Sequence, residues 1–376
     1  MEYLFSVSSY SFERVRRFTI SIFKHKLIPL EKVSLYIHIP YCHKKCSYCD
    51  FYSTITGNET EINNVLTQIL KDTEVFLEEL EYPFIKTLFI GGGTPSSIPV
   101  VIFTGFLQKL GAVLKNIPQE YTIEINPETV SRELLDILTV NKINRISIGV
   151  QSLNERILAT LGRNTNVENT IKALETIKKY WKGTFSIDLI NAVPGQAIEM
   201  ALSDIEKINI FSPDHISLYS LTFEPDTQLY NLLKNGKITV LSENIDTLMQ
   251  KKSISLLKTL GYKRYEISNY CKKGKESLHN LNYWKMGTSL GIGPSAASTL
   301  LSKNGPVRLK NIPDTSAFIS YVPINKRMEQ DFISKESFLL EHLMMGFRLL
   351  KGIDILHINS VFKIDIVEYL KPLFIK

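Results

Sequence analysis

The sequence is poor in cysteine, in long apolar runs and in blocks of like charge. Its 376 residues contain only 4 cysteines, which argues against the disulfide framework of a secreted protein. No run of about 18 apolar residues occurs, so we expect no membrane-spanning helix. The net charge of +6 is mild, and no charged block is long enough to indicate nucleic-acid binding. These absences predict a cytoplasmic protein of a reducing compartment, with no nucleic-acid partner.

Residues 1–32 form a basic, amphipathic N-terminal extension, most clearly over Phe12–Lys26. The extension lacks the long apolar region and small-residue cleavage site of a secretory signal. Two interpretations stay open. The segment could make a peripheral membrane contact or act as a transit-like sequence, or it could pack on the rest of the protein as a plain appendage, which we favour.

Short apolar strands alternate with helices between residues 33 and 235, which predicts a parallel sheet covered by helices. Six strand–helix units are too few for a closed eight-stranded barrel, so we expect an α/β fold of the partial (β/α)6 type. An open doubly wound sheet is the alternative. The six expected strands are Leu35–Ile39, Lys86–Ile90, Tyr121–Ile125, Arg145–Gly149, Thr184–Ile190 and His215–Tyr219.

The pattern changes after the sixth strand, and residues 236–376 are predicted to form a smaller mixed α/β C-terminal domain. We expect a helix over Glu243–Leu260 and a short strand over Tyr262–Ile267. A stretch rich in glycine, asparagine and serine follows from residue 268 to 298, and a last long helix is expected over Ser334–Leu350.

Three of the four cysteines lie in one short loop after the first expected strand. Cys42, Cys46 and Cys49 have the spacing C-x3-C-x2-C. Thiolates are soft ligands that suit iron–sulfur clusters or zinc. A zinc site would need a fourth ligand, such as His38 or His43, and usually shows a second cysteine pair, which this chain lacks. Three cysteines on a four-iron cluster leave one iron open to a further ligand, and this interpretation is favoured.

Other polar residues and glycines follow the ends of the expected strands, where barrel active sites gather. A glycine run, Gly91–Gly93, follows the second strand and lets the backbone approach a ligand closely. Glu124, Gln151 and Asp188 follow at the third, fourth and fifth strands. Each alone could be a polar cap at a strand end, but together they predict a cofactor site.

The cysteine spacing resembles the signature of the radical S-adenosylmethionine (SAM) superfamily, in which SAM chelates the open iron of a [4Fe–4S] cluster. The motifs Gly-Gly-Gly-Thr-Pro95, Glu124-Ile-Asn-Pro127, Gly149-Val-Gln151-Ser152, Leu161-Gly-Arg163 and Asp188-Leu-Ile190 are similar to those of the anaerobic coproporphyrinogen III oxidase family. That family includes oxidases (HemN type) and heme chaperones (HemW type). The resemblance implies SAM contacts at Tyr36, Tyr48, Gly92, Gly93, Thr94, Glu124, Gln151, Arg163 and Asp188.

Two features favour the chaperone branch. The oxidases carry a further cysteine two residues after the third cluster ligand, and this chain has Phe51 there. His279-Asn-Leu-Asn-Tyr-Trp284 resembles the heme motif H-N-x-x-Y-W of the chaperones, which implies heme binding by His279, Asn280, Tyr283 and Trp284. Histidine is a common axial ligand of heme iron, and the aromatic rings offer flat faces to a porphyrin.

The resulting hypothesis is a heme chaperone of the radical SAM type, which binds a [4Fe–4S] cluster, SAM and heme and passes heme to an unidentified acceptor protein. A flavodoxin- or ferredoxin-like electron donor is implied by the same resemblance. The alternative is an oxygen-independent coproporphyrinogen III oxidase that decarboxylates its substrate oxidatively. Whether the chain is an enzyme stays open at this point.

Overall fold

The computed structural model describes residues 27–55, 57–303, 305–320 and 323–374. The basic segment Phe12–Lys26 lies outside the described residues. Within them, one sheet contains twelve strands in the order β14-β13-β12-β11-β1-β4-β5-β6-β7-β8-β10-β9. Six consecutive neighbours in this order are parallel and confirm the expected strands: β1 (Lys32–Ile39), β4 (Phe84–Gly92), β5 (Glu120–Ile125), β6 (Arg145–Gln151), β7 (Thr184–Asn191) and β8 (His215–Ser220).

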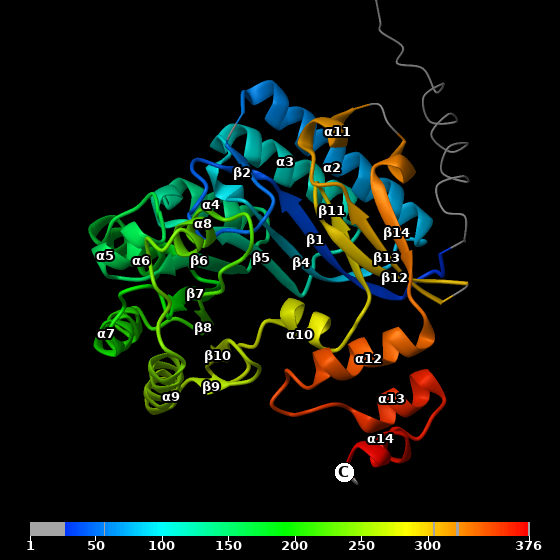
Figure 1. Cartoon of the computed structure of the whole chain (residues 1–376). Coiled ribbons are helices and arrows are strands. Elements are labelled where there is room, and N and C mark those ends of the chain that lie inside the picture. Colours follow the sequence, from blue (N-terminus) through cyan, green and yellow to red (C-terminus); the bar gives the residue numbers. More distant parts are fainter. Residues whose placement is uncertain (1–26, 56, 304, 321–322, 375–376) are drawn as a thin grey trace, which may run out of the picture.

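The strand order separates the two architectures that periodicity left open. Each parallel strand lies next to its predecessor, with no reversal of direction along the sheet. Right-handed crossovers without a reversal place all the helices on one face, whereas a doubly wound sheet reverses and carries helices on both. The fold is therefore a partial barrel, with α2 and α3 above its strands and α5, α6 and α7 along one side (Figure 1). The covering helices are α2 (Glu59–Glu79), α3 (Val100–Val113), α4 (Arg132–Val140), α5 (Glu155–Thr160), α6 (Val167–Tyr180), α7 (Ile198–Asn209), α8 (Gln228–Lys234) and α9 (Glu243–Thr259).

Alternating burial along the strands directs side chains to the two faces of the sheet. In β1, Leu35, Ile37 and Ile39 are fully buried in the main apolar core. A residue between them, Tyr36, points to the opposite, inner face of the barrel, because successive side chains of a strand alternate. Helix starts are fixed locally: the Asn58 side chain, for example, accepts a hydrogen bond from Glu61 N at the start of α2.

The strands after residue 236 extend the same sheet at both of its edges. On one side, β10 (Asn269–Cys271) pairs antiparallel with β8 and with β9 (Lys263–Arg264). On the other, β11 (Ser289–Ile292) pairs parallel with β1 and leads to β12 (Ala297–Ser302), β13 (Gly305–Asn311) and β14 (Met328–Phe332). The main apolar core continues from Leu27 to Met328, across the predicted boundary. The division at residue 236 stays a prediction.

Two details of the C-terminal prediction were wrong. The strand expected over Tyr262–Ile267 is only β9, because the chain turns after it: the Glu266 carboxylate accepts a hydrogen bond from Ser268 N, and β10 begins at Asn269. The stretch 268–298 contains α10 (Leu278–Trp284) and β11. The expected last helix ends early, as α12 (Lys335–Gly346), and the backbone after it pairs elsewhere: Leu350 N donates to Tyr265 O at 3.1 Å. The remaining helices are α11 (Thr315–Ile319), α13 (Ile355–Phe362) and α14 (Ile366–Phe374).

Candidate functional site

The three cysteines lie in a loop at the carboxyl ends of the barrel strands. Cys42 is on the short strand β2 (Tyr41–Cys42), which pairs with β3 (Thr54–Ile55), and Cys49 N donates to Cys46 O at 3.2 Å. Ser47, between them, is anchored on both sides: its N–H donates to Leu161 O at 3.0 Å, and its carbonyl accepts from Leu229 N at 2.8 Å. The three thiols are half-buried, form no disulfide and line a cavity of about 430 Å³.

The surroundings of the cysteines fit an iron–sulfur cluster better than zinc. Both ring nitrogens of His38 are engaged, by the Tyr36 hydroxyl at 3.0 Å and by Tyr52 O at 2.8 Å, so this side chain is no fourth ligand. In the described part of the chain, no three Cys, His, Asp or Glu side chains converge as a single metal ion requires. A four-iron cluster spreads its ligands more widely. The Arg163 guanidinium donates to Cys46 Sγ at 3.4 Å, so a cation lies beside the cysteine loop.

Two carboxylates face the same cavity opposite the cysteines. Burial, and then the nearby Asp188, raise the pKa of Glu124 to about 8, although Gly92 N donates to its Oε2 at 3.2 Å. Burial also raises the pKa of Asp188, whose oxygens accept from Ser147 Oγ at 3.0 and 3.1 Å. A pair of desolvated carboxylates is stabilised by a cation. SAM carries a sulfonium charge, and so the donor set fits this cofactor.

The glycine run holds the cysteine loop against β4. Gly92 has φ +113°, a conformation that suits glycine. A Cβ on Gly93 would lie 2.5 Å from Tyr41 O and 3.0 Å from Cys42 Sγ. The sequence-based expectation was that glycine leaves room for a ligand only. This explanation was incomplete, because the Gly93 backbone also lies close to Tyr41 and Cys42 of the cysteine loop.

Most of the remaining expected SAM contacts also line this cavity. Gln151 has φ +64° at an irregularity of β6, where the register with β7 shifts after Gly149. Arg163 Nη2 donates to Gly149 O at 2.8 Å and to Asn126 Oδ1 at 3.0 Å. The cavity lining includes Tyr48, Gly92, Gly93, Thr94, Glu124, Gln151, Arg163 and Asp188. It also includes Asn126, Ser147 and Tyr219, which were not predicted, although Tyr219 lies near the end of a strand as the same rule requires.

Tyr36 is the exception, because it is not part of the cavity lining. Burial, then Glu124 and Tyr283, raise the pKa of its hydroxyl well above the usual range. The side chain is on the inner face of the barrel, where its hydroxyl lies 3.0 Å from His38 Nδ1 and its ring centroid lies 6.2 Å from that of Phe89. Phe51, the residue that marks the chaperone branch, is 67% exposed and lines the rim of the cavity beside Cys49.

The heme motif lies at the opposite end of the barrel, where α10 covers the first residues of the strands (Figure 1). His279 is buried there: its ring stacks on Phe89 of β4 with centroids 5.2 Å apart, and the edge of Tyr283 approaches at 5.1 Å. His279 Nδ1 lies 2.8 Å from Thr87 Oγ1, and its buried Nε2 has no hydrogen-bond partner. Burial lowers the pKa of this histidine to about 3, so the ring is neutral at physiological pH.

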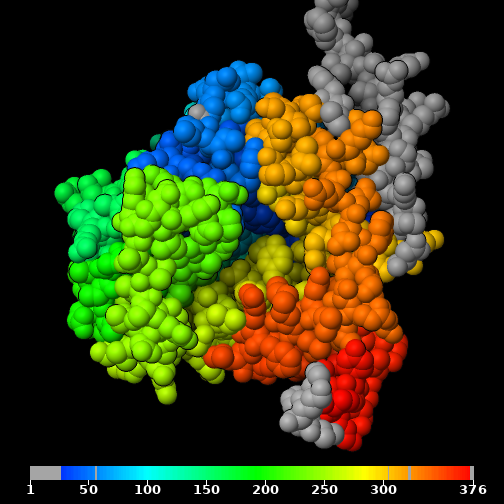
Figure 2. Space-filling view, viewed as in Figure 1, coloured from blue at the N-terminus to red at the C-terminus, as the bar shows by residue number. Residues whose placement is uncertain are grey.

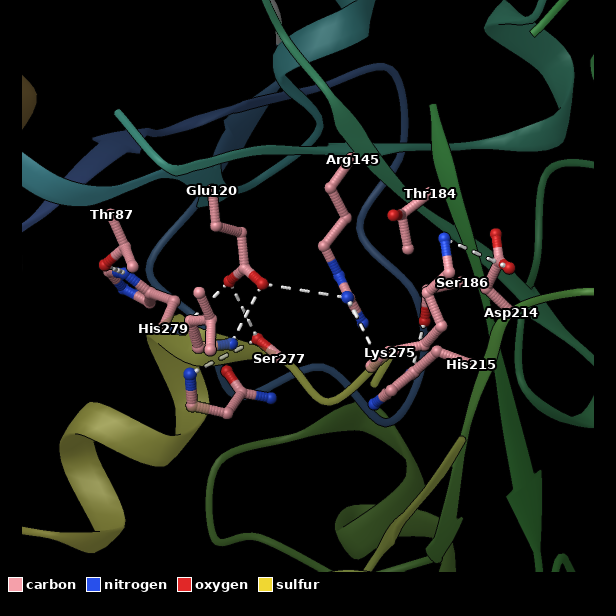
Figure 3. Close-up of polar contacts among 12 residues, drawn as sticks. Thr87, Glu120, Arg145, Thr184, Ser186, Asp214, His215, Lys275, Ser277 and His279 are labelled. Atoms are coloured by element: carbon pink, nitrogen blue, oxygen red, sulfur yellow. Dashed lines mark hydrogen bonds and ion pairs between the residues drawn. The ribbon is translucent and has the colours of Figure 1, made fainter. Parts of the chain in front are cut away.

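A buried carboxylate fixes the start of α10 (Figure 3). Glu120, the first residue of β5, accepts from Ser277 Oγ at 3.2 Å and from the backbone N–H groups of Leu278 and His279, both at 2.9 Å. Its charge is balanced by Arg145 of β6 at 3.7 Å, and both side chains are buried. Neither residue was predicted, because each stands at the start of a strand, away from the motif in sequence.

The other three motif residues are half-buried on α10. Trp284 Nε1 is buried without a partner, and the Arg348 guanidinium lies 5.2 Å from the Trp284 ring. Figure 2 shows a recess in the surface at this place, with the yellow segment that carries α10 at its floor and the orange C-terminal helices beside it. Asn280, Tyr283 and Trp284 thus share α10 with His279. This helix carries two buried nitrogens without a hydrogen-bond partner, Nε2 of His279 and Nε1 of Trp284.

Comparison with known proteins agrees with this architecture. The sequence model of the Radical SAM superfamily matches residues 36–208. A heme chaperone HemW from Buchnera aphidicola (subsp. Acyrthosiphon pisum) is 37% identical, over 87% of this chain and 85% of that protein. The chain belongs to the HemW family. Another HemW, from Escherichia coli, is 35% identical over 75% of this chain and 74% of its own length.

A eukaryotic relative and a solved structure complete the comparison. The radical S-adenosyl methionine domain-containing protein 1, mitochondrial, of Danio rerio is 32% identical to this HemW family member, over 87% of this chain and 75% of that protein. The structure of coproporphyrinogen III oxidase (HemN) from Escherichia coli shares the fold, with a TM-score of 0.77 at 19% identity, over 95% of this chain and 86% of that one. No described helix is both long and apolar enough to cross a membrane.

Proposed function

We propose that this protein is a heme chaperone, which binds a [4Fe–4S] cluster and SAM at the open end of the barrel, binds heme at α10 and passes it to an acceptor protein. The observation that carries the heme part is the buried, unpartnered Nε2 of His279 among aromatic rings. Buried polar atoms are nearly always paired, so an orphan of this kind points to a missing partner. The names of the relatives, heme chaperone HemW, support the same role.

At the open end, Cys42, Cys46 and Cys49 would hold the cluster, and Arg163 would stabilise the Cys46 thiolate. Glu124 and Asp188 would balance the sulfonium charge of SAM, and the Gly92–Gly93 backbone would keep the cysteine loop in place. When bound, the cluster and SAM supply the one-electron chemistry of the superfamily. An electron donor would be required to reduce the cluster.

The second candidate is an oxygen-independent coproporphyrinogen III oxidase. It is favoured by the fold shared with HemN and by a cavity open enough for a substrate. Phe51 opposes it, because this exposed side chain stands at the cavity rim where the oxidase branch has a cysteine. The segment His279–Trp284 lies at the far end of the barrel from the cysteines, so porphyrin bound there would be separate from the cofactor cavity, which also opposes the oxidase.

The two candidates are distinguished on anaerobically reconstituted protein. The wild-type protein should bind heme in a titration, and His279→Ala should shift the Soret band and weaken binding. His43→Ala is the matched control, since His43 is an exposed histidine of the cysteine loop, and it should behave as wild type. With reductant, SAM and coproporphyrinogen III, no steady formation of protoporphyrinogen IX is expected. Such formation would establish the oxidase instead.

A further inference from the structure

A chain of hydroxyl groups connects β1 and β4 to the ring of His279. Ser34 and Thr87 are register partners in these two parallel strands. Thr87 Oγ1 donates its proton to Ser34 Oγ at 2.8 Å, and it lies 2.8 Å from His279 Nδ1 on its other side. All three residues are buried, so water does not compete for these bonds.

The direction of the hydrogen bond between Thr87 and Ser34 determines which atom donates in the contact between Thr87 and His279. A threonine hydroxyl has a single proton, and here that proton is given to Ser34. Towards His279, Thr87 Oγ1 is therefore an acceptor, and Nδ1 of the imidazole must carry the hydrogen. In a neutral ring with the hydrogen on Nδ1, the free lone pair is on Nε2. This is the same nitrogen that has no partner in the structure.

Other buried histidines of the barrel do not leave a nitrogen open. His215 on β8 contacts Ser186 Oγ at 2.7 Å through Nδ1 and the Tyr265 hydroxyl at 2.9 Å through Nε2. His38 uses both nitrogens in the same way. In His279, by contrast, only Nδ1 has a hydroxyl contact, and Nε2 has no hydrogen-bond partner.

We propose that Ser34 and Thr87 are positioning residues, which hold His279 in the Nδ1–H form and so present the Nε2 lone pair to heme iron. This inference rests on the proposed heme-binding function and assigns residues of the first two barrel strands to it. Metal-ligating histidines commonly donate their other N–H to a fixed acceptor, which sets the ring orientation and raises the basicity of the ligating nitrogen. Here the acceptor is a threonine hydroxyl, itself fixed by a serine.

The tautomer is measured first, on heme-free protein. Nitrogen-15 chemical shifts of labelled histidines distinguish Nδ1–H from Nε2–H, and His279→Gln identifies the signal among the 7 histidines of the chain. The wild-type signal should show Nδ1–H, and Thr87→Val should lose that preference because the acceptor is gone. A predominant Nε2–H form in the wild-type protein would overturn the inference, whatever its affinity for heme.

The effect on the ligand is measured second, by heme titration and by the iron–histidine stretching band of the ferrous complex. Thr87→Val should weaken heme binding by about 10- to 100-fold, the usual cost of removing such a partner, and should shift the stretching band. Thr87→Ser keeps the hydroxyl and should restore both. Ser186→Ala is the matched control, because it removes the corresponding contact of His215, and it should leave both readouts at their wild-type values.

Heme ligation by His279 and the positioning role of Thr87 are tested by different variants. If His279→Ala leaves the Soret band unchanged, the heme ligation itself is wrong. If His279→Ala changes the band while Thr87→Val matches wild type in affinity and in stretching frequency, the positioning role is wrong and the ligation stands. Should Thr87→Val not fold, Ser34→Ala tests the same chain: it should shift the stretching band in the same direction, and an unchanged band contradicts the proposal.

Discussion

The two ends of the barrel use their polar groups in different ways. At the carboxyl ends of the strands, thiols, two carboxylates and an arginine line an open cavity of about 430 Å³. At the other end, Glu120 accepts hydrogen bonds from the first N–H groups of α10, and this helix carries two buried nitrogens without a partner, Nε2 of His279 and Nε1 of Trp284. The open end can admit a cofactor as it stands. The covered end has to move before an iron can reach His279 Nε2.

This difference indicates that the two ends of the sheet have separate roles. Strand ends carry the residues that we assign to the cluster and SAM, while strand starts hold the segment that we assign to heme. The two sets share no residue. Each end can therefore be altered separately, and the following predictions proceed from the largest expected effect to the smallest.

Loss of one thiol should abolish the cofactor function of the open end. Cys46→Ala should remove most of the cluster iron and the thiolate-to-iron absorption, because three ligands are needed to hold the cluster in one loop. Iron and sulfide are measured per chain after anaerobic reconstitution. Cys271→Ala is the control, since this buried cysteine lies outside the cavity lining and should be dispensable. A full complement of iron in Cys46→Ala would contradict the assignment.

A side chain at Gly93 should damage the open end almost as severely. In Gly93→Val the new Cβ would press on Tyr41 O and Cys42 Sγ, so we expect loss of cluster iron as well as loss of SAM binding by calorimetry. Gly111→Ala on α3 is the control, because no neighbouring atom lies within 4 Å of the added carbon. If Gly93→Val kept its iron and lost only SAM, the glycine would serve the ligand alone.

Removal of Glu120 should loosen the covered end without affecting the cysteines. Glu120→Ala leaves the buried Arg145 charge and the N–H groups of α10 without their partner, which should lower the free energy of unfolding by about 3–5 kcal/mol in urea titrations. Glu168→Ala removes the carboxylate of an exposed ion pair with Lys172 and should change stability little. Equal effects of the two substitutions would mean that Glu120 does not anchor α10.

The last of these effects is a pH dependence set by Glu124. Its pKa is about 8 in the folded protein against an ordinary value of 4.5, so between these values the folded state retains a proton that the unfolded chain has released. Stability of the ligand-free protein should therefore fall as pH rises from about 4.5 to 8. Glu124→Gln should flatten part of this fall in the melting temperature, whereas Glu128→Gln should not. Parallel pH profiles of wild type and Glu124→Gln would show that Glu124 does not titrate in this way.

The residues expected at the open end follow a positional rule, and the structure brings them to one cavity. Glu124, Gln151 and Asp188 each follow a strand, and parallel strands bring their carboxyl ends to one edge. The covered end was predicted only as a motif. Thr87 and Glu120 contact a helix more than a hundred residues away, and Ser34 and Arg145 contact these two residues in turn. Nothing near the four residues in sequence indicates these contacts. The seven-residue α10 is likewise too short to stand out by periodicity, and its start depends on Glu120 from another strand.

The central claim is that porphyrin binds at the covered end of the barrel and SAM at the open end. Hydrogen exchange of the reconstituted protein, measured by mass spectrometry with heme or SAM added separately, tests it directly. Heme should change exchange in the segment 265–286, which contains α10, and SAM should change it in the cysteine loop and the Gly91–Gly93 turn. If heme changed exchange only around the cysteine loop, as a substrate of the open cavity would, the assignment of heme to α10 would be contradicted.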